Sequence, residues 1–332
     1  MLEFARSVPS TTPTIGRNLA RYLVGRVLRS RLGPRISDRP AVYLSHFVVH
    51  GRLPNLREQR TFSERIAFRR LCPQAIFTPL SDKFEARGYV EDRVGAAFLV
   101  PLHAVTSDPE RFPFESLPRS YMMKANHGCG WNEVVLNSAQ ADVGALRAKA
   151  RAWLDQNFAR HKRERHYSSI RPKIMFETLL QDDGRVPKDY KIHCFRRNGQ
   201  LTQVIQVHCD RFGDHRVNFF TPEWEPISFS HGYASAVMEA VPRPANLDDM
   251  LGLAARLSDP FNYVRVDLYS LGERIYFGEL TFTPGAGLMA FDPYVVDAEW
   301  AGHFDPDPSY FADGSTVAGF DLKPGIPMGA TA

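Results

Sequence analysis

Hydrophobic and polar residues alternate along residues 264–281, which read VRVDLYSLGERIYFGELT. Two alternating stretches with a short polar segment between them predict two β-strands joined by a tight turn. Asp267 lies on the first predicted strand and Glu279 on the second. Antiparallel pairing would place these two carboxylates side by side, with the hydroxyl group of Thr281 next along the strand. Because successive side chains point to opposite faces of a strand, Arg265 shares the face of Asp267.

Five predicted elements precede this hairpin along the chain. Residues 81–90 (SDKFEARGYV) have the pattern of a helix start, with Ser81 or Asp82 as N-cap. Four apolar stretches predict strands, and the second of them ends at Lys124 and continues into a glycine-containing loop. These stretches are residues 96–105 (AAFLVPLHAV), 121–131 (YMMKANHGCGW, loop included), 174–180 (IMFETLL) and 189–195 (DYKIHCF). Together with the helical segments, they predict an α+β fold.

Helical periodicity dominates the N-terminal region. Residues 18–32 (NLARYLVGRVLRSRL) place apolar side chains near one face and arginines around the remainder, which predicts a basic amphipathic helix. This helix is too short and too charged to span a membrane, so it would either lie on an anionic membrane surface or pack on the protein body. Residues 62–71 (FSERIAFRRL), with Ser63 as N-cap, and the charged stretch 142–165 are also expected to be helical.

The two hairpin carboxylates form a candidate metal site. Mg²⁺ prefers oxygen ligands and usually takes one or two carboxylates together with substrate phosphates, so Asp267, Glu279 and Thr281 suit it. The guanidinium group of Arg265 would then assist phosphoryl transfer, where charge neutralisation does much of the catalysis. Lys124 and the glycine loop could contact phosphate oxygens. On the residues alone, a surface hairpin with acids present by chance is the alternative.

Composition and charge narrow the choice of partners. The chain has 332 residues with a formal net charge of +4, and 44% of its residues are hydrophobic, as in an ordinary globular protein. A mildly basic chain suits an anionic substrate or a membrane surface. No basic run is interleaved with aromatic residues, so a nucleic-acid partner is not expected. The four cysteines form no C-x-x-C pair, which predicts a reducing, cytoplasmic location.

Several of these segments together resemble the TupA-like (teichuronopeptide biosynthesis) branch of the ATP-grasp superfamily. The resemblance covers residues 61–305, and its motifs are TFSERIAFRRL, SDKFEARGYV, MMKANHGCGW, RPKIMFETLL, DYKIHCF and RVDLYSLGERIYFGELTFTPGAG. It implies an α+β ATP-grasp fold, in which two subdomains clasp ATP. It also implies a carboxylate–amine ligase that forms an acylphosphate, and a role in joining amino acids to cell-surface polysaccharide or polyuronate.

The resemblance also implies a role for each matching position. Lysines 83 and 124 would bind ATP phosphates beneath the loop at 126–130, positions 177–180 would pair with adenine, and position 189 would receive the ribose. The implied nucleotide-binding residues are Lys83, Lys124, Asn126, His127, Gly128, Gly130, Glu177, Leu179, Leu180, Asp189 and Lys191. The implied catalytic residues are Arg265, Asp267 and Glu279, and the implied Mg²⁺ ligands are Asp267, Glu279 and Thr281. Many superfamily members have Asn at the last position, but a hydroxyl group can still ligate Mg²⁺ or hold a water ligand.

These inferences define the expected organisation. Residues 1–75 would form an N-terminal extension, residues 76–305 the ATP-grasp region with a mobile ATP-covering part at about 120–185, and residues 306–332 a Pro/Gly-rich tail. The expected activity is Mg²⁺- and ATP-dependent ligation of an amino acid to an anionic polysaccharide or peptide acceptor, with peripheral contact to the inner membrane face through residues 18–32. Two alternatives remain: an ATP-grasp kinase that phosphorylates a carbohydrate hydroxyl group, and a non-catalytic nucleotide-binding scaffold of a polysaccharide assembly complex.

Overall fold

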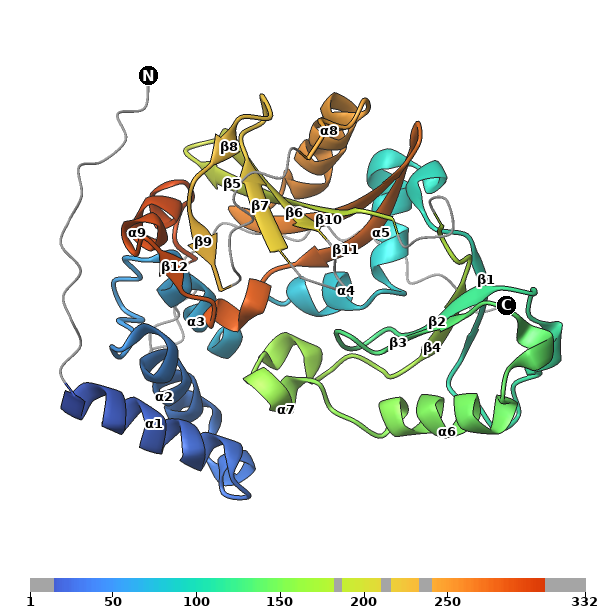
Figure 1. Ribbon diagram of the computed structural model, residues 1–332, viewed down its shortest axis with the longest axis horizontal. Helices are drawn as coiled ribbons and strands as arrows, with labels where there is room; N and C mark the ends of the chain where they lie inside the picture. Colours follow the sequence, from blue (N-terminus) through green and yellow to red (C-terminus); the bar gives the residue numbers. More distant parts are fainter. Residues whose placement is uncertain (1–14, 182–186, 210–215, 233–240, 308–332) are drawn as a thin grey trace.

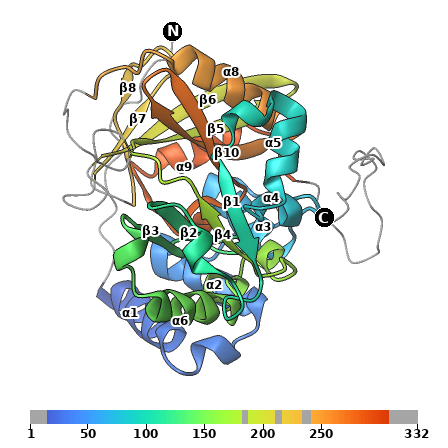
Figure 2. The ribbon, with the colours of Figure 1, turned by 90° about the vertical axis from the view of Figure 1, so that its right-hand side faces the viewer.

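The computed structural model of the chain describes residues 15–181, 187–209, 216–232 and 241–307 (Figure 1). Within these residues, two main β-sheets of different size lie beside each other, and helices cover both (Figures 1 and 2). The larger sheet has six strands and the smaller has four. A third sheet has two short strands, β9 (Ser230–His231) and β12 (Phe291–Asp292). A group of N-terminal helices lies below the larger sheet in Figure 1, on the side away from the small sheet. The mixture of helices and antiparallel sheets confirms the predicted α+β class.

The six-stranded sheet is antiparallel throughout, with strand order β11–β10–β5–β6–β7–β8. Its strands are β5 (Asp189–Arg197), β6 (Gln200–Cys209), β7 (Arg216–Phe220), β8 (Pro226–Ile227), β10 (Tyr263–Leu271) and β11 (Arg274–Thr281). Helices α5 (Ala86–Val94) and α8 (Leu247–Ser258) pack on one face. Buried side chains such as Ile192, Val266 and Leu257 fill the space between, so the polar side chains of β5 and β10 are left for the other face.

Helix α3 (Phe62–Leu71) and helix α9 (Val295–Gly302) pack on that other face, towards one end of the sheet. Phe62 lies in an aromatic cluster that includes Trp300. Arg69 is completely buried and is 2.5 Å from Asp307, and it also donates to the carbonyl oxygens of Tyr263 and Phe282. A buried arginine is stable only when it is paired in this way, so α3 is part of the body of the large sheet.

The smaller sheet has strand order β1–β4–β2–β3 and is also antiparallel. Its strands are β1 (Leu102–Thr106), β2 (Tyr121–Ala125), β3 (Asn132–Val135) and β4 (Ile174–Glu177). Helix α6 (Val143–Leu154) covers one face (Figure 2), and Trp153 packs there against the sheet's own buried core. Short segments α4 (Phe77–Ser81) and α7 (Ala159–Lys162) lie between the two sheets and the N-terminal helices.

Helix α1 (Ile15–Arg29) packs lengthwise on α2 (Asp38–His50). Arg21 donates to the carbonyl oxygens of Val48 and Val49 at 2.8 and 2.9 Å, which ties α1 to the C-terminal end of α2. The N-terminal amphipathic helix is therefore present, but it begins and ends three residues earlier than the 18–32 segment predicted. Across the described residues, no helix is both long enough and apolar enough to cross a bilayer.

Two predicted helix starts are wrong. α4 ends at Ser81 and α5 begins only at Ala86, so residue 82 is not an N-cap; the Asp82 carboxylate instead accepts from two backbone N–H groups of the intervening turn. The N-cap of α3 is Thr61 rather than Ser63, which bonds to Asp297 of α9. In both cases a tertiary or turn contact takes the side chain that local sequence would assign to a cap.

Two predicted element lengths are also wrong. The strand expected over 96–105 begins at Leu102, and residues Ala96–Phe98 form a 3₁₀ turn. Pro101, which has no N–H group to donate, stands directly before the strand. The charged stretch 142–165 is helical only in α6 and α7, because the chain turns between them. The predicted tail, residues 306–332, lies almost entirely outside the described residues.

Candidate active site

The register of β10 and β11 brings the predicted acidic residues together. Asp267 is paired with Glu279, and Arg265 is paired with Thr281 one step along the ladder. Arg265 contacts Asp267 through two nitrogens, at 2.6 and 2.7 Å, which is the bidentate geometry of a strong guanidinium–carboxylate pair. It also donates to the Thr281 hydroxyl oxygen at 3.0 Å, and Thr281 donates to Glu279 at 3.1 Å. These four side chains therefore form one connected group on the face away from α8.

Strand β5 adds a lysine to this group. Lys191 is in register with Asp267, and its ammonium nitrogen lies 2.5 Å from Asp267 and 2.6 Å from Asp189. Burial alone would lower the pKa of Lys191, but the two carboxylates raise it above its ordinary value. Lys191 is therefore a fixed positive charge in the middle of the sheet, with a carboxylate on either side.

Glu279 is the carboxylate of this group that solvent reaches best. Its side chain is 28% exposed, whereas that of Asp267 is 4% exposed. Burial would raise the pKa of Glu279, but the cations of Lys83 and Arg265 lower it to about 2. Glu279 is therefore ionised at neutral pH, and it is the carboxylate best placed to exchange its partners for a metal ion.

Lys83 connects this sheet to the glycine loop. Its ammonium nitrogen lies 3.3 Å from Glu279 and 2.6 Å from the carbonyl oxygen of Gly128. Its backbone N–H donates to the carbonyl oxygen of Asn126 at 3.1 Å. One lysine in the turn between α4 and α5 thus contacts both the large sheet and the loop that follows β2.

Buried polar contacts with other segments fix the glycine loop, residues 126–130. Asn126 donates to Asp82 at 2.9 Å and accepts from the backbone N–H of Lys173 at 2.7 Å, and His127 contacts the carbonyl oxygen of Trp153 at 3.1 Å. A Cβ atom at Gly128 would lie 2.5 Å from the Trp131 ring, so a side chain does not fit there without movement. Gly130 has φ +77°, a conformation that favours glycine.

Lys124 and Glu177, predicted to contact phosphate and adenine respectively, lie against each other. The Lys124 ammonium nitrogen is 2.5 Å from Glu177, and Arg87 lies 3.3 Å from the other oxygen of the same carboxylate. Leu179 and Leu180 follow β4 after Thr178 and are half-buried. Lys124 and Glu177 therefore lie together on neighbouring strands of the small sheet, and Lys124 would have to share or release Glu177 to reach a phosphate.

The donor set suits Mg²⁺. Two carboxylates and a hydroxyl group, Asp267, Glu279 and Thr281, present only oxygen atoms, and Mg²⁺ completes its shell with phosphate oxygens and water. No group of three or more His, Cys, Asp or Glu side chains stands in metal-binding geometry within the described part of the chain. A metal bound here would therefore take some of its ligands from the protein and the others from a nucleotide. The cations of Arg265, Lys83 and Lys191 would balance the remaining negative charge.

Two residues of this region escaped the sequence reasoning. Glu164 is buried and accepts from the Thr283 hydroxyl at 2.5 Å, so the segment after α7 is joined to the turn η6 (Pro284–Gly287) that follows β11. Tyr167 has its pKa raised well above the ordinary value by burial and by the negative charges of Glu164 and Glu279. In the sequence, Glu164 is distinguished only as the single acidic residue within the basic run RHKRERH, residues 160–166.

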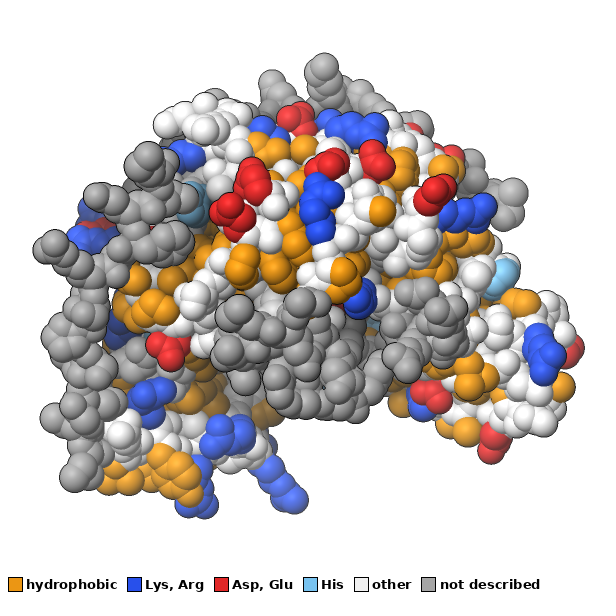
Figure 3. All heavy atoms as spheres, turned by 45° about the horizontal axis from the view of Figure 1, so that its top comes forward, with side chains coloured by type: hydrophobic (Ala, Val, Ile, Leu, Met, Phe, Trp, Pro, Cys, Tyr) orange, Lys and Arg blue, Asp and Glu red, His pale blue; other side chains and the backbone are white. Residues whose placement is uncertain are grey.

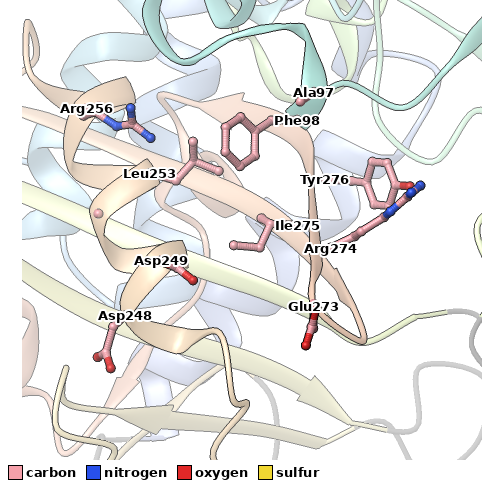
Figure 4. Close-up of a pocket in the computed structure, with 11 residues that line it drawn as sticks. Ala97, Phe98, Asp248, Asp249, Leu253, Arg256, Glu273, Arg274, Ile275 and Tyr276 are labelled. Atoms are coloured by element: carbon pink, nitrogen blue, oxygen red, sulfur yellow. The ribbon is translucent and has the colours of Figure 1, made fainter.

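A separate open pocket of about 830 Å³ lies on the opposite face of the large sheet, between α8 and the β10–β11 turn (Figure 4). Phe98, Leu253 and Ile275 lie between the helix and the strand, and Asp248 of α8 and Glu273 of the β10–β11 turn also line the pocket (Figure 4). None of its lining residues belongs to the group around Glu279. It is therefore distinct from the predicted nucleotide site.

Comparison with solved structures gives distant similarity only. D-alanine–D-alanine ligase from Helicobacter pylori is 14% identical, with 68% of this chain and 61% of that chain covered and a TM-score of 0.40. A RiPP-associated ATP-grasp ligase from Chryseobacterium gregarium, solved with ADP and leader and core peptides, is 14% identical over 63% and 54% of the two chains, with a TM-score of 0.32. The chain thus spans little more than half of the length of these proteins.

No curated protein sequence is significantly similar to the chain. A sequence model of the TupA-like ATP-grasp family, in contrast, matches residues 67–304. The match begins within α3 and ends just after α9, so it includes both sheets and every residue of the group around Glu279. The chain has the ATP-grasp fold and belongs to the TupA-like ATP-grasp family.

Proposed function

We propose that the chain is a Mg²⁺-dependent ATP-grasp ligase that activates a carboxylate as an acylphosphate and joins it to an amine. The observation that carries this proposal is the position of Glu279. Its ionised carboxylate contacts Lys83, which also holds Gly128 of the glycine loop, and neighbours Arg265 on the sheet. When a nucleotide binds, its phosphate oxygens could replace Glu279 as the partner of Lys83, and its Mg²⁺ could replace Lys83 as the partner of Glu279.

Each residue of the group has a distinct task in this proposal. Bound Mg²⁺ would supply neutralisation of phosphate charge, with Asp267, Glu279 and Thr281 as its protein ligands. Arg265, held in one orientation by Asp267, would stabilise the charge of the transferred phosphoryl group. Lys83 and Lys124 would bind phosphate oxygens, and Asp189 and Lys191 would face the ribose end of the nucleotide.

The carboxylate and amine would meet beside the turn η6. Gly285 and Gly287 there have φ of +57° and +63°, a conformation that residues with side chains rarely adopt, and Gly285 is less buried than its neighbours in the turn. The glycine N–H groups of the turn would receive the acceptor carboxylate, because the Ala286 N–H already donates to the carbonyl oxygen of Thr283. Holding acid and amine together would supply much of the rate enhancement through proximity. The acceptor we propose is an anionic polysaccharide, polyuronate or polyglutamate, and the amine is an amino acid. Membership of the TupA-like family supports this role in cell-envelope polysaccharide biosynthesis.

The exposed face of α1 supports a location at the inner face of the cytoplasmic membrane. Leu19, Tyr22 and Leu23 are each more than half exposed, beside basic residues that include Arg26 and Arg29. Figure 3 shows hydrophobic and basic side chains adjacent to each other at its lower left, over the N-terminal helices. An exposed apolar strip flanked by arginines is the arrangement of a helix that lies on an anionic lipid surface.

Sedimentation with lipid vesicles tests this location. The chain is expected to bind vesicles that contain phosphatidylglycerol at low salt, and to be released at high salt because the attraction is electrostatic. Leu23→Glu should weaken binding to the vesicles. Leu136→Glu, at an exposed position directly after β3 of the small sheet, should not. Equal binding by both variants and the unaltered chain would assign α1 to packing only.

The proposed chemistry is tested by trapping with hydroxylamine. With ATP, Mg²⁺ and uronic-acid or polyglutamate acceptors, ADP release should be accompanied by a hydroxamate, because an acylphosphate reacts with hydroxylamine. A phosphorylated hydroxyl group with no hydroxamate would identify a kinase instead. Nucleotide binding without ADP release across amino-acid and acceptor screens would identify a scaffold protein.

A further inference from the structure

The segment from Asn157 to Ser168 has two sides with different chemistry. Glu164 faces the proposed active site, where it accepts from Thr283 at 2.5 Å. Arg163 and Arg165, the residues on either side of it, face away from that contact and bond to the N-terminal helices. The same short stretch of chain therefore connects the turn η6 to a second, basic surface.

That second surface contains a pocket of about 360 Å³. It is lined by Asp38, Asn157, Ala159, Arg160, Arg163, Arg165 and Ser168. Three guanidinium groups face one carboxylate there, so the lining carries net positive charge. The volume lies at the lower end of the range for small-ligand pockets, which is enough for one acidic sugar or amino-acid unit.

Two of the arginines are held in place by protein contacts that leave part of each guanidinium group unused. Arg163 lies 3.5 Å from Asp38 and donates to the carbonyl oxygen of Gly33 at 3.0 Å. Arg165 donates to Asp38 at 2.9 Å and to the carbonyl oxygen of Leu71 at 3.2 Å. Each arginine has five N–H donors, so both can still bind an oxyanion without breaking these contacts.

The third arginine of the pocket, Arg160, differs from these two. Within the described residues, neither a hydrogen bond nor an ion pair is seen for the Arg160 side chain. Asn157 accepts from the backbone N–H of Ala159 at 3.0 Å through its oxygen, so its amide NH₂ group is available to donate. Arg160 and Asn157 thus add unused donors beside two arginines whose orientation is already fixed, a set that matches a carboxylate.

We propose that this pocket is a second acceptor subsite, which binds one carboxylate-bearing unit of a polyanionic acceptor while another unit lies at η6. The inference rests on the proposed function for the identity of the acceptor. Its physical basis is the shared segment: Glu164 reaches η6, and its two chain neighbours reach the pocket. A polymer with repeated carboxylates would gain affinity by occupying both places, because the second contact becomes intramolecular once the first is made.

Direct binding without ATP tests the subsite separately from catalysis. The probes are polygalacturonate, poly-glutamate and the galacturonate monomer, with binding followed by calorimetry at low and high salt. Arg160→Glu should weaken binding of at least one polymer by about tenfold or more, because a charge-assisted contact becomes repulsive. Arg160→Lys should retain most of the affinity, and Arg274→Gln, at the exposed β10–β11 turn, should leave it unchanged. All variants should bind ATP as the unaltered chain does.

Three results would overturn the subsite. These are failure of both polymers to bind, polymer affinity that is equal in Arg160→Glu and the unaltered chain, and binding of phosphatidylglycerol vesicles alone through Arg160, which would assign the arginines to the membrane. Loss of polymer binding in Arg160→Glu supports it even if no ADP is ever released, and in that case only the ligase proposal fails.

Discussion

The ammonium group of Lys83 lies 3.3 Å from a carboxylate oxygen of Glu279. The two residues come from different parts of the fold, the turn after α4 and the strand β11. A cation proposed to bind phosphate therefore neutralises a carboxylate proposed to bind metal. Without nucleotide, Lys83 and Glu279 neutralise each other, and with nucleotide, phosphate and Mg²⁺ would neutralise them instead. The site would stay close to electrically neutral in both states, which lowers the free-energy cost of burying these charges.

Replacing Glu279 tests the metal assignment. Glu279→Gln keeps the shape of the side chain but removes its charge, so Mg²⁺-dependent ADP release should fall by about two orders of magnitude or more. Circular dichroism should show the fold unchanged. Glu273→Gln, at the exposed turn of the same hairpin, is the matched control and should have normal activity. Comparable Mg²⁺-dependent rates in the two variants would contradict the assignment.

Replacing Lys124 tests the nucleotide site on the small sheet. A lysine–phosphate contact is charge-assisted and contributes about 1.5–3 kcal/mol, so Lys124→Ala should weaken ATP binding about tenfold or more. Lys149→Ala removes an exposed lysine of α6, the helix that covers the small sheet, which is paired with Glu133, and should leave ATP affinity unchanged. Calorimetry measures both. If Lys124→Ala binds ATP as tightly as Lys149→Ala, then Lys124 serves only to pair with Glu177.

The glycine loop allows a steric test. Gly128→Val would bring a side chain against the Trp131 ring, where even a Cβ atom would lie at 2.5 Å, so the loop should shift and ATP should bind more weakly. Cys129→Ser alters the adjacent residue with little change of volume and should leave ATP affinity and ADP release nearly unchanged. Tryptophan fluorescence should report the displacement of Trp131 in the first variant. An unshifted spectrum with normal ATP affinity would show that the loop tolerates side chains here.

Buried histidines predict loss of stability in acid. Burial lowers the pKa of His46, His166 and His231 to about 3, whereas the same groups in an unfolded chain titrate near 6.5. Their contribution to stability is therefore complete above about pH 6.5. It declines as the pH falls, because only the unfolded state binds protons between pH 6.5 and 3. Each histidine should reduce the free energy of unfolding by about 2 kcal/mol at pH 5.

His166 provides the cleanest test, since neither of its ring nitrogens has a hydrogen-bond partner among the described residues. His166→Leu should make the dependence of the unfolding free energy on pH shallower by about 1.2 kcal/mol per pH unit between pH 5 and 6. Urea unfolding across this range measures the slope. His161→Leu, at an exposed position, should leave the slope as it was. Parallel slopes for His166→Leu and the unaltered chain would refute the prediction.

Local pattern was sufficient to predict the strands that carry the candidate site. The β10–β11 hairpin, β2 and β5 lie within or close to the predicted ranges, and the pairing of Asp267 with Glu279 follows from the alternation of side chains. Alternation has a fixed period, so it places every side chain of a strand on a definite face. The family was inferred from the resemblance of these motifs to a known family, and the match over residues 67–304 confirms it.

Tertiary structure decided which charged residues from distant parts of the chain meet. Nothing local to Lys124 or Glu177 indicates that they form an ion pair, or that Glu164 accepts from Thr283 across more than a hundred residues. The helix starts at Ser63 and Asp82 were mispredicted because distant or turn partners satisfied those side chains. Hydrogen bonds and ion pairs depend on distances in space, and once the chain folds these are set by the packing of the two sheets and not by neighbours in sequence.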